Sequence, residues 1–260
     1  MKRFAERVIK YLISLVLIVY SFTVGMITKK GRYIHSLIDE YYGFAFRKPR
    51  LPVLTWDNVI SDQPVQLTEL EGRPGNIPVG ELALIAGIIL KEKPRAVFEI
   101  GTFDGRTTMN MALNSPQDCR IFTLDLPKEM VSETRFKISA RHLPLIEKDI
   151  SGERFQNKTA GEFSVINKIT QLLGDSGKFD FSPYYNSIDL IFIDGSHDYD
   201  YVLNDSEIAL KLLRDGKGII LWHDYRVGME VINAIETFRK RHAYLKIYHV
   251  KNTNLAYVKI

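Results

Sequence analysis

The chain has 260 residues, 45% of them hydrophobic, which is enough for one large domain with a substantial core. Its single cysteine, Cys119, excludes an internal disulfide and therefore a disulfide-stabilised secreted scaffold. The net charge of +4 arises in residues 1–50, which hold ten Lys and Arg against three Asp and Glu. The remainder is slightly acidic, so no nucleic-acid partner is expected.

Residues 11–28 contain no charged side chain, and basic residues flank them on both sides. A helix of this length extends about 27 Å at about 1.5 Å per residue, close to the thickness of a bilayer's hydrocarbon core. We predict a single membrane span or anchor over 11–28. A signal peptide and a buried or interfacial helix are the alternatives.

The next two segments differ in composition from the rest of the chain. Residues 31–46 are aromatic-rich and amphipathic, which predicts a short helix lying on a membrane surface or on the domain. Residues 47–80 carry five of the ten prolines, as is typical of an extended connector. We therefore divide the chain into an N-terminal membrane anchor with its amphipathic segment (1–46), a connector (47–80) and a main domain (81–260).

Helical and strand-like segments alternate through the main domain, with a polar inserted loop expected at 148–165. We predict helices over 80–93, 106–115, 128–143, 201–215 and 227–242. We predict strands over 94–101, 120–126, 169–176, 187–195, 217–224, 244–250 and 254–260. The last two are close enough for an antiparallel hairpin. The strands are apolar throughout, which favours an α/β fold with a doubly wound, mostly parallel sheet covered on both faces.

Polar residues gather where these strands end. Ligands of such sheets bind beyond the carboxyl ends of the strands, so the short motifs found there predict one common site. The positions concerned are Glu99 to Gly101, Asp125, Gly174 and Asp175, Asp194 to His197, and His223 with Asp224.

The loop EIGTFDGRTT (99–108) joins the first strand to its helix. Phe103 rules out the G-x-G-x-x-G fingerprint, and the loop has no Gly-Lys-Ser/Thr of a P-loop. Gly101 and Gly105 allow a tight turn and a close approach of the backbone to a ligand. Asp125, which closes the second strand, can accept hydrogen bonds from a ribose diol.

Five motifs in this order, EIGTFDGRTT, TLDL, LLGDS, DLIFIDGSH and IILWHDY, resemble class I S-adenosylmethionine-dependent methyltransferases, in particular the methyltransferase 24 type. The resemblance covers about residues 75–260 and implies a Rossmann-like, seven-stranded sheet in which the final hairpin provides the antiparallel strand. It implies that Asp125 holds the ribose of S-adenosylmethionine and that Asp175 approaches its adenine. The remaining cofactor contacts that it implies are Glu99, Gly101, Thr102, Gly105 and Asp194.

Some relatives of this kind bind a divalent metal through acids that end the fourth and fifth strands, with a base three residues after the first acid. The matching positions here are Asp194, the pair His223 and Asp224, and His197. Carboxylates suit Mg²⁺, but the imidazole of His223 suits Zn, Fe or Ni better, so a metal-free site is the alternative. We predict His197 as general base, and the other possibility is that it only caps a helix.

The remaining polar residues of IFIDGSHDYD (191–200) have simpler interpretations. Ser196 is expected in a turn, because the sequence has no nucleophile elbow. Asp198 and Asp200 are expected to begin a helix, where the dipole favours acids. Trp222 and Tyr225 either line the acceptor pocket or pack in the core.

Together these motifs predict methyl transfer from S-adenosylmethionine to a hydroxyl of a small molecule, sugar or lipid-linked saccharide. The alternatives are a metal-dependent hydrolase using Asp194, His197, His223 and Asp224, and a non-catalytic membrane-tethered domain. Because the cofactor is made in the cytosol, the main domain is expected to face the cytoplasm. The sequence predicts no particular oligomeric state.

Overall fold

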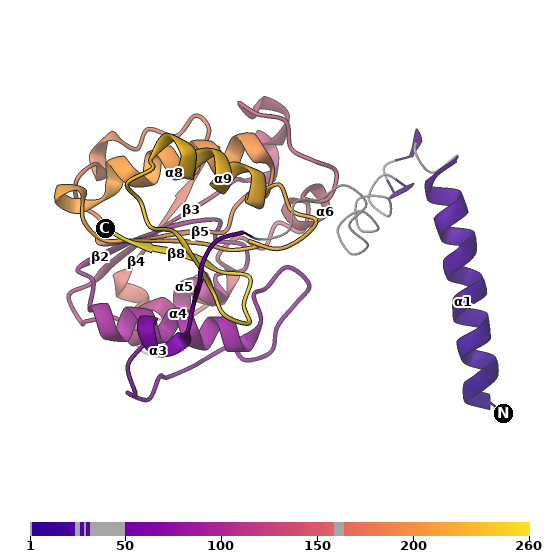
Figure 1. Ribbon diagram of the computed structural model, residues 1–260, viewed down its shortest axis with the longest axis horizontal. Helices are drawn as coiled ribbons and strands as arrows, with labels where there is room; N and C mark the ends of the chain where they lie inside the picture. Colours follow the sequence, from indigo (N-terminus) through magenta and orange to yellow (C-terminus); the bar gives the residue numbers. More distant parts are fainter. Residues whose placement is uncertain (1, 24–26, 29, 32–49, 159–163) are drawn as a thin grey trace.

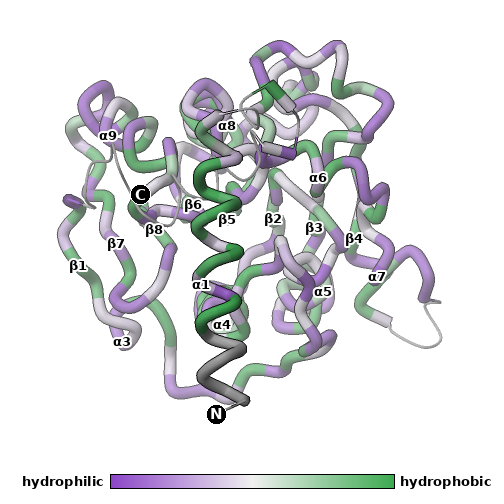
Figure 2. The backbone as a smooth tube through the Cα atoms, turned by 90° about the vertical axis from the view of Figure 1, so that its right-hand side faces the viewer, coloured by the Kyte–Doolittle hydropathy of each residue, from purple (hydrophilic) through white to green (hydrophobic). Residues whose placement is uncertain are grey.

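The computed structural model describes residues 2–23, 27–28, 30–31, 50–158 and 164–260. At its centre is an eight-stranded sheet in the order β1-β7-β8-β6-β5-β2-β3-β4, which Figure 2 shows from left to right. All pairings are parallel except those of β8 with β6 and β7. The strands are β1 (Val53–Leu54), β2 (Ala96–Ile100), β3 (Arg120–Asp125), β4 (Ile169–Leu173), β5 (Leu190–Ile193), β6 (Ile219–Trp222), β7 (Tyr248–Val250) and β8 (Ala256–Lys259). The mostly parallel sheet and the final hairpin are therefore confirmed.

Helices cover both faces of this sheet (Figure 1). On one face lie α3 (Trp56–Val59), α4 (Val79–Glu92) and α5 (Arg106–Asn114), and on the other α8 (Tyr199–Leu212) and α9 (Val231–Arg241). Packing against the sheet explains the apolar sequence of α4, because Leu82, Ile85 and Ile89 are fully buried there. Two hydrophobic clusters, one on each face, form the core.

The predicted connector is part of the domain over its described residues, 50–80. Val53 and Leu54 pair in parallel with β7, which makes the sheet eight-stranded rather than seven-stranded. Leu51 and Val59 are buried, and the indole of Trp56 donates a hydrogen bond to the carbonyl of Lys251 at 2.8 Å. The proline content thus reflects an irregular path over the domain surface rather than a free linker.

The helix expected over 128–143 is the clearest error within the main domain. The segment contains the 3-10 turn η2 (Lys128–Glu133), irregular backbone, and then the short helix α6 (Leu143–Ile146). Tertiary contacts replace the helical hydrogen bonds, since the backbone N–H of Arg135 donates to Asp175 and that of Ser139 donates to Asp198. We call the whole stretch between β3 and β4, residues 126–168, the inserted region; it is longer than the loop expected at 148–165 and also contains α7 (Glu153–Gln156) and η3 (Ser164–Lys168). Elsewhere lie η4 (Ser182–Tyr184) and η5 (Arg214–Gly216).

The N-terminal helix α1 (Lys2–Ser21) does not match the predicted span over 11–28. It begins within the charged segment, where Lys, Arg, Ala and Glu are good helix formers, and it ends at Ser21. Its uncharged part, 11–21, extends only about 17 Å, against about 30 Å of hydrocarbon core. Within the described residues, none of the helices combines the length and hydropathy needed to cross a bilayer.

Figure 2 shows the apolar stretch of α1, whose large side chains from Val8 to Tyr20 are exposed. The amphipathic helix expected over 31–46 lies outside the described residues from position 32 onward. The cytoplasmic location stays a prediction.

Candidate active site

A cavity of about 560 Å³ opens beyond the carboxyl ends of β2, β3, β5 and β6. This is where the strand order reverses, because the chain moves outward from β2 to β3 and β4 and then returns to place β5 on the other side of β2. Such a switch point leaves a crevice that side chains from several loops can reach. Gly101, Asp125, Asp175, Asp194 and His197, all singled out from the sequence, line this one cavity.

Gly101 lies where the ends of β2 and β5 come close together. Its φ is +101°, and a Cβ at this position would lie 2.3 Å from the carbonyl oxygen of Asp194. Only glycine therefore allows the end of β2 to pass so closely beside the end of β5. The neighbouring Thr102 also lines the cavity, and its hydroxyl lies 2.6 Å from that of Thr123.

Two of the predicted cofactor residues are not in the cavity wall. Glu99 is fully buried behind it, where its carboxylate accepts hydrogen bonds from Thr108 at 2.5 Å and Thr123 at 2.6 Å. Burial raises the pKa of Glu99 to about 8, so this carboxyl group carries a proton near neutral pH. Gly105 begins α5 with a φ of +84° and packs against Phe155 of α7. Both residues support the loop rather than line the cavity.

Asp125 and Asp175 reach the cavity from the ends of β3 and β4. Burial raises the pKa of Asp125 to about 6, although hydrogen bonds from Ser151 and from nearby backbone N–H groups act in the opposite direction. The carboxylate of Asp175 already accepts three hydrogen bonds, from the backbone of Arg135 and Gly177 and from the hydroxyl of Tyr201. Both carboxyl groups are thus held by hydrogen bonds from neighbouring loops at the edge of the cavity.

The residues of the predicted catalytic and metal site come together at the ends of β5 and β6. His197 Nε2 lies 3.0 Å from Asp224 Oδ2 and 3.7 Å from Asp194 Oδ1. His223 Nδ1 lies 3.1 Å from Asp194 Oδ1 and 3.6 Å from Asp224 Oδ2. One potential ligand atom from each of Asp194, His223 and Asp224 falls within 4.8 Å of the others. The backbone of Asp224 is left-handed, with a φ of +54°.

This cluster holds two acids and two imidazoles in a nearly dry environment. Burial opposes charge on His197, but the carboxylates of Asp224 and Asp194 outweigh it and raise its pKa to about 9. The pKa of His223 is likewise raised, against burial, by the same two acids. Burial acts to raise the pKa values of Asp194 and Asp224, yet both are held below the usual range by the charges of His223 and His197. In this environment the two carboxylates thus favour the charged form of both imidazoles.

Comparisons with known proteins bear on this arrangement. The model of the methyltransferase 24 family, described as a methyltransferase domain, matches residues 98–225. This range begins within β2, ends just after β6, and contains both the loop 101–105 and the cluster of Asp194 and Asp224. The chain carries a class I, S-adenosylmethionine-dependent methyltransferase domain. The motif resemblance in the sequence is thereby confirmed, and the hydrolase alternative loses its support.

Solved structures show the same fold at low sequence identity. The SAH-bound methyltransferase PaMTH1 of Podospora anserina is similar with a TM-score of 0.53 and 14% identity, over 72% of this chain and 80% of that one. The O-methyltransferase TomG from Streptomyces achromogenes, involved in tomaymycin synthesis and solved in complex with SAM, has a TM-score of 0.50 and 15% identity, over 71% and 81%. A comparison with curated protein sequences gave no match.

Two residues that contact the histidines of this cluster were missed in the sequence. Glu81 of α4 lies 2.7 Å from His223 Nε2 and so directs the other imidazole nitrogen toward the acids. His142, just before α6, is buried, with Nε2 3.2 Å from His197 Nδ1 and Nδ1 3.2 Å from Asp198 Oδ2. Glu81 stood in an apolar helix and His142 in a segment predicted to be helical. Neither position carries a motif.

Asp198 and Ser196 have more than the local roles expected of them. Asp198 is the N-cap residue of α8, as predicted, but its carboxylate also accepts hydrogen bonds from Ser139 and Ser196. It thereby ties the inserted region to the end of β5. Trp222 and Tyr225 are fully buried in the core, where the indole donates to Ser206 and the phenol oxygen accepts from the backbone of residues 50 and 51.

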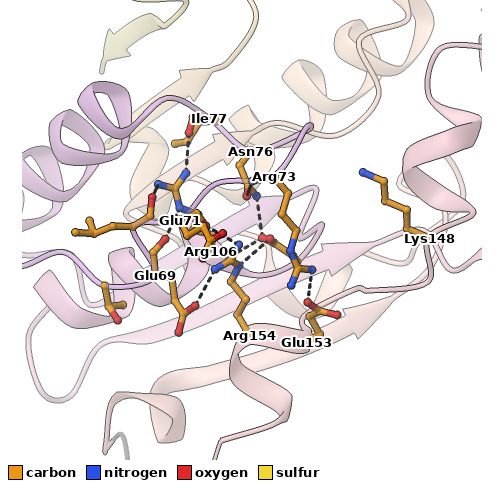
Figure 3. A network of polar contacts seen from close by, with 12 residues as sticks. Glu69, Glu71, Arg73, Asn76, Ile77, Arg106, Lys148, Glu153 and Arg154 are labelled. Carbon is orange, nitrogen blue, oxygen red and sulfur yellow. Dashed lines mark hydrogen bonds and ion pairs between the residues drawn. The ribbon is translucent and has the colours of Figure 1, made fainter.

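Residues 74–78 form one wall of the cavity, and the segment 69–78 is held by two arginines (Figure 3). The guanidinium of Arg106, 2% exposed, donates to the carbonyls of residues 69, 70 and 77. Arg154 of α7 pairs with Asp104 and Glu69, both at 2.7 Å. Because these contacts join the segment to the loop 101–105 and to the inserted region, three separate stretches of chain form one wall.

Proposed function

We propose that this protein transfers a methyl group from S-adenosylmethionine to a hydroxyl oxygen of a small molecule or saccharide, with His197 as general base. The observation that carries the proposal is that one cavity is lined both by the glycine loop with Asp125 and by the cluster of Asp194 and His197. A donor and an acceptor bound in the same cavity meet without diffusion, which is the main requirement of this reaction.

The cofactor end of the cavity fits S-adenosylmethionine in its chemistry. Gly101 leaves room for close approach to the backbone, and Asp125 offers a carboxylate at the wall for a diol. Thr102 and Asp194 are the neighbouring polar groups, and Asp175 is proposed to face the adenine. S-adenosylmethionine supplies the methyl group and leaves as S-adenosylhomocysteine.

In this proposal His197 receives the acceptor's proton at Nε2, since its Nδ1 contacts His142 Nε2 at 3.2 Å. As the acceptor oxygen forms its bond to the methyl carbon, the hydroxyl proton passes to the imidazole and the electron pair of the breaking carbon–sulfur bond stays on sulfur. Asp194 and Asp224 stabilise the imidazolium that results, from 3.7 Å and 3.0 Å. His142 holds the other ring nitrogen of His197 and so fixes the ring's orientation.

Binding of S-adenosylhomocysteine to the full chain tests the proposal. Isothermal titration is expected to give one site per chain with a Kd in the micromolar range. Asp125→Ala is expected to weaken binding about tenfold or more, since the loss of charge-assisted hydrogen bonds is worth about 1.5–3 kcal/mol. Asp180→Ala, at an exposed acid outside the cavity, is the matched control. A folded protein that binds no S-adenosylhomocysteine would refute the function.

We further propose that a divalent cation binds between Asp194, His223 and Asp224. The donors fit, because two carboxylate oxygens and the Nδ1 of His223 face one another while Glu81 holds the Nε2. An outer carboxylate on a ligating imidazole is common at metal sites. Such a cation would hold the acceptor oxygen and lower the pKa of its hydroxyl.

Chelation is the direct test of the cation. Treatment with EDTA is expected to reduce turnover at least tenfold, with recovery on adding back Mg²⁺, Mn²⁺ or Zn²⁺, and Asp224→Asn is expected to abolish the recovery. Metal content measured on the purified protein gives a readout independent of activity. Unchanged turnover after chelation, in protein shown to contain no metal, would remove the cation while leaving the role of His197 intact.

A further inference from the structure

Arg141 is a cavity residue that neither the cofactor nor the proton transfer uses. It stands beside His142 in the inserted region and lines the cavity together with Met229 and Arg226. Its Nη1 lies 3.2 Å from the thioether sulfur of Met229, which is a weak acceptor. Its positive charge acts on the site, because after burial and the charge of His197 it is among the causes that lower the pKa of His142.

The Nε of Arg141 lacks a hydrogen-bond partner. Five buried side-chain nitrogen or oxygen atoms within the described part of the chain have none, and of these only Arg141 Nε belongs to a residue of the cavity wall. The other four are on Glu99, Asp205, Glu236 and Arg239. The protein encloses this Nε, so a ligand in the cavity would meet the terminal nitrogens of the guanidinium, of which Nη1 has only the weak thioether acceptor.

The other arginine and lysine side chains of the cavity wall are neutralised by acids. Lys128 pairs with Asp149, and Arg226 pairs with Asp224 at 2.7 Å. For Arg141 the described residues provide no carboxylate within ion-pair distance. Among the arginines and lysines of the cavity wall, Arg141 is thus the one whose counter-ion a bound ligand would supply.

From this we infer that the acceptor carries an anionic group, a carboxylate or a phosphate, which Arg141 binds while the acceptor's hydroxyl faces His197. The inference rests on the proposed methyl transfer and adds the chemical class of the acceptor. The planar guanidinium can give two parallel hydrogen bonds to such an oxyanion, which fixes the acceptor's orientation as well as its charge. His142 connects the proposed anion site with the proposed base, because it follows Arg141 in the chain and its Nε2 lies 3.2 Å from Nδ1 of His197.

The probes are inorganic phosphate and acetate, titrated separately into the full chain saturated with S-adenosylhomocysteine, at constant ionic strength set by chloride. Binding is followed by chemical shifts of backbone amides. We expect millimolar binding, weakened about tenfold or more in Arg141→Gln and less in Arg141→Lys, which keeps the charge but not the fork. The stronger of the two probes indicates a phosphorylated or a carboxylated acceptor.

Arg239→Gln is the matched control, because Arg239 also has a buried Nε without a partner but lies outside the cavity. It is expected to leave anion affinity unchanged. Equal anion affinity in the wild type and Arg141→Gln would overturn the inference, as would an absence of anion binding in protein that holds S-adenosylhomocysteine. A tenfold loss of S-adenosylhomocysteine affinity in Arg141→Gln would also overturn it, by assigning Arg141 to the cofactor's own carboxylate. Failure to bind S-adenosylhomocysteine at all would instead refute the methyltransferase function.

Discussion

Replacing His197 with alanine is expected to reduce turnover by about 10²–10⁴, the usual contribution of a positioned general base. S-adenosylhomocysteine affinity is expected to stay within about threefold of the wild type, because the glycine loop and Asp125 form a different part of the cavity wall. The two effects separate a catalytic role from a structural one. They are measured by a methyl-transfer assay, once an acceptor is found, and by isothermal titration.

The pH dependence of kcat/KM, compared between the wild type and His197→Ala, gives a second readout. Asp224 and Asp194 raise the pKa of His197 to about 9 against the effect of burial, so its imidazole is mostly protonated at neutral pH. Only the neutral imidazole accepts a proton, and kcat/KM is therefore expected to rise with pH until about 9 in the cation-free protein. The His197→Ala variant is expected to lose this rise. A bound cation would compete with the proton for the acids and move the rise to lower pH.

His242→Ala is the matched control for this experiment. His242 is also paired with an acid, Glu207, at 2.9 Å, but it follows α9 and does not line the cavity. Its replacement is expected to leave turnover and its pH dependence unchanged. Equal losses of turnover and of S-adenosylhomocysteine affinity in His197→Ala would mean that His197 only supports the fold of the site.

The sheet was predictable because each central strand can be recognised from the residues of its own segment. Segments such as 190–193 and 219–222 are apolar at every position, and parallel strands buried on both faces require this pattern. The acids and histidines that follow them then had to lie at one edge, since all parallel strands end on the same side. Asp194, His197, His223 and Asp224 were found in this way.

The partners of those residues could not be found in the same way. Glu81 reaches His223 from a helix 142 positions earlier, and His142 reaches His197 from irregular backbone. Both depend on packing between distant segments, and no local pattern records such contacts. The same applies to residues 50–80, where proline suggested a linker although β1 adds a strand to the sheet. At the N-terminus, a count of uncharged residues was mistaken for the bounds of a helix.

Gly101→Ala is expected to have the largest effect on stability, lowering the free energy of unfolding by about 3 kcal/mol or more. Its new Cβ would lie 2.3 Å from the carbonyl oxygen and 2.5 Å from the carbonyl carbon of Asp194. These are backbone atoms of the neighbouring strand end, so no side-chain rotation can relieve the contact, and the φ of +101° adds strain. Urea unfolding of the full chain measures the loss.

Gly195→Ala provides the control from the other side of the same junction. A Cβ on Gly195 would have its nearest contact at 3.4 Å, with Cγ2 of Ile100, so we expect a loss below about 1 kcal/mol. Separating β2 from β5 to admit the Gly101→Ala methyl group would move Asp194 away from Thr102, and S-adenosylhomocysteine affinity should fall together with stability. If Gly101→Ala unfolds at the same urea concentration as the wild type, the two strand ends do not meet this closely. The switch point would then be wide enough that Asp194 and the glycine loop need not act on one ligand.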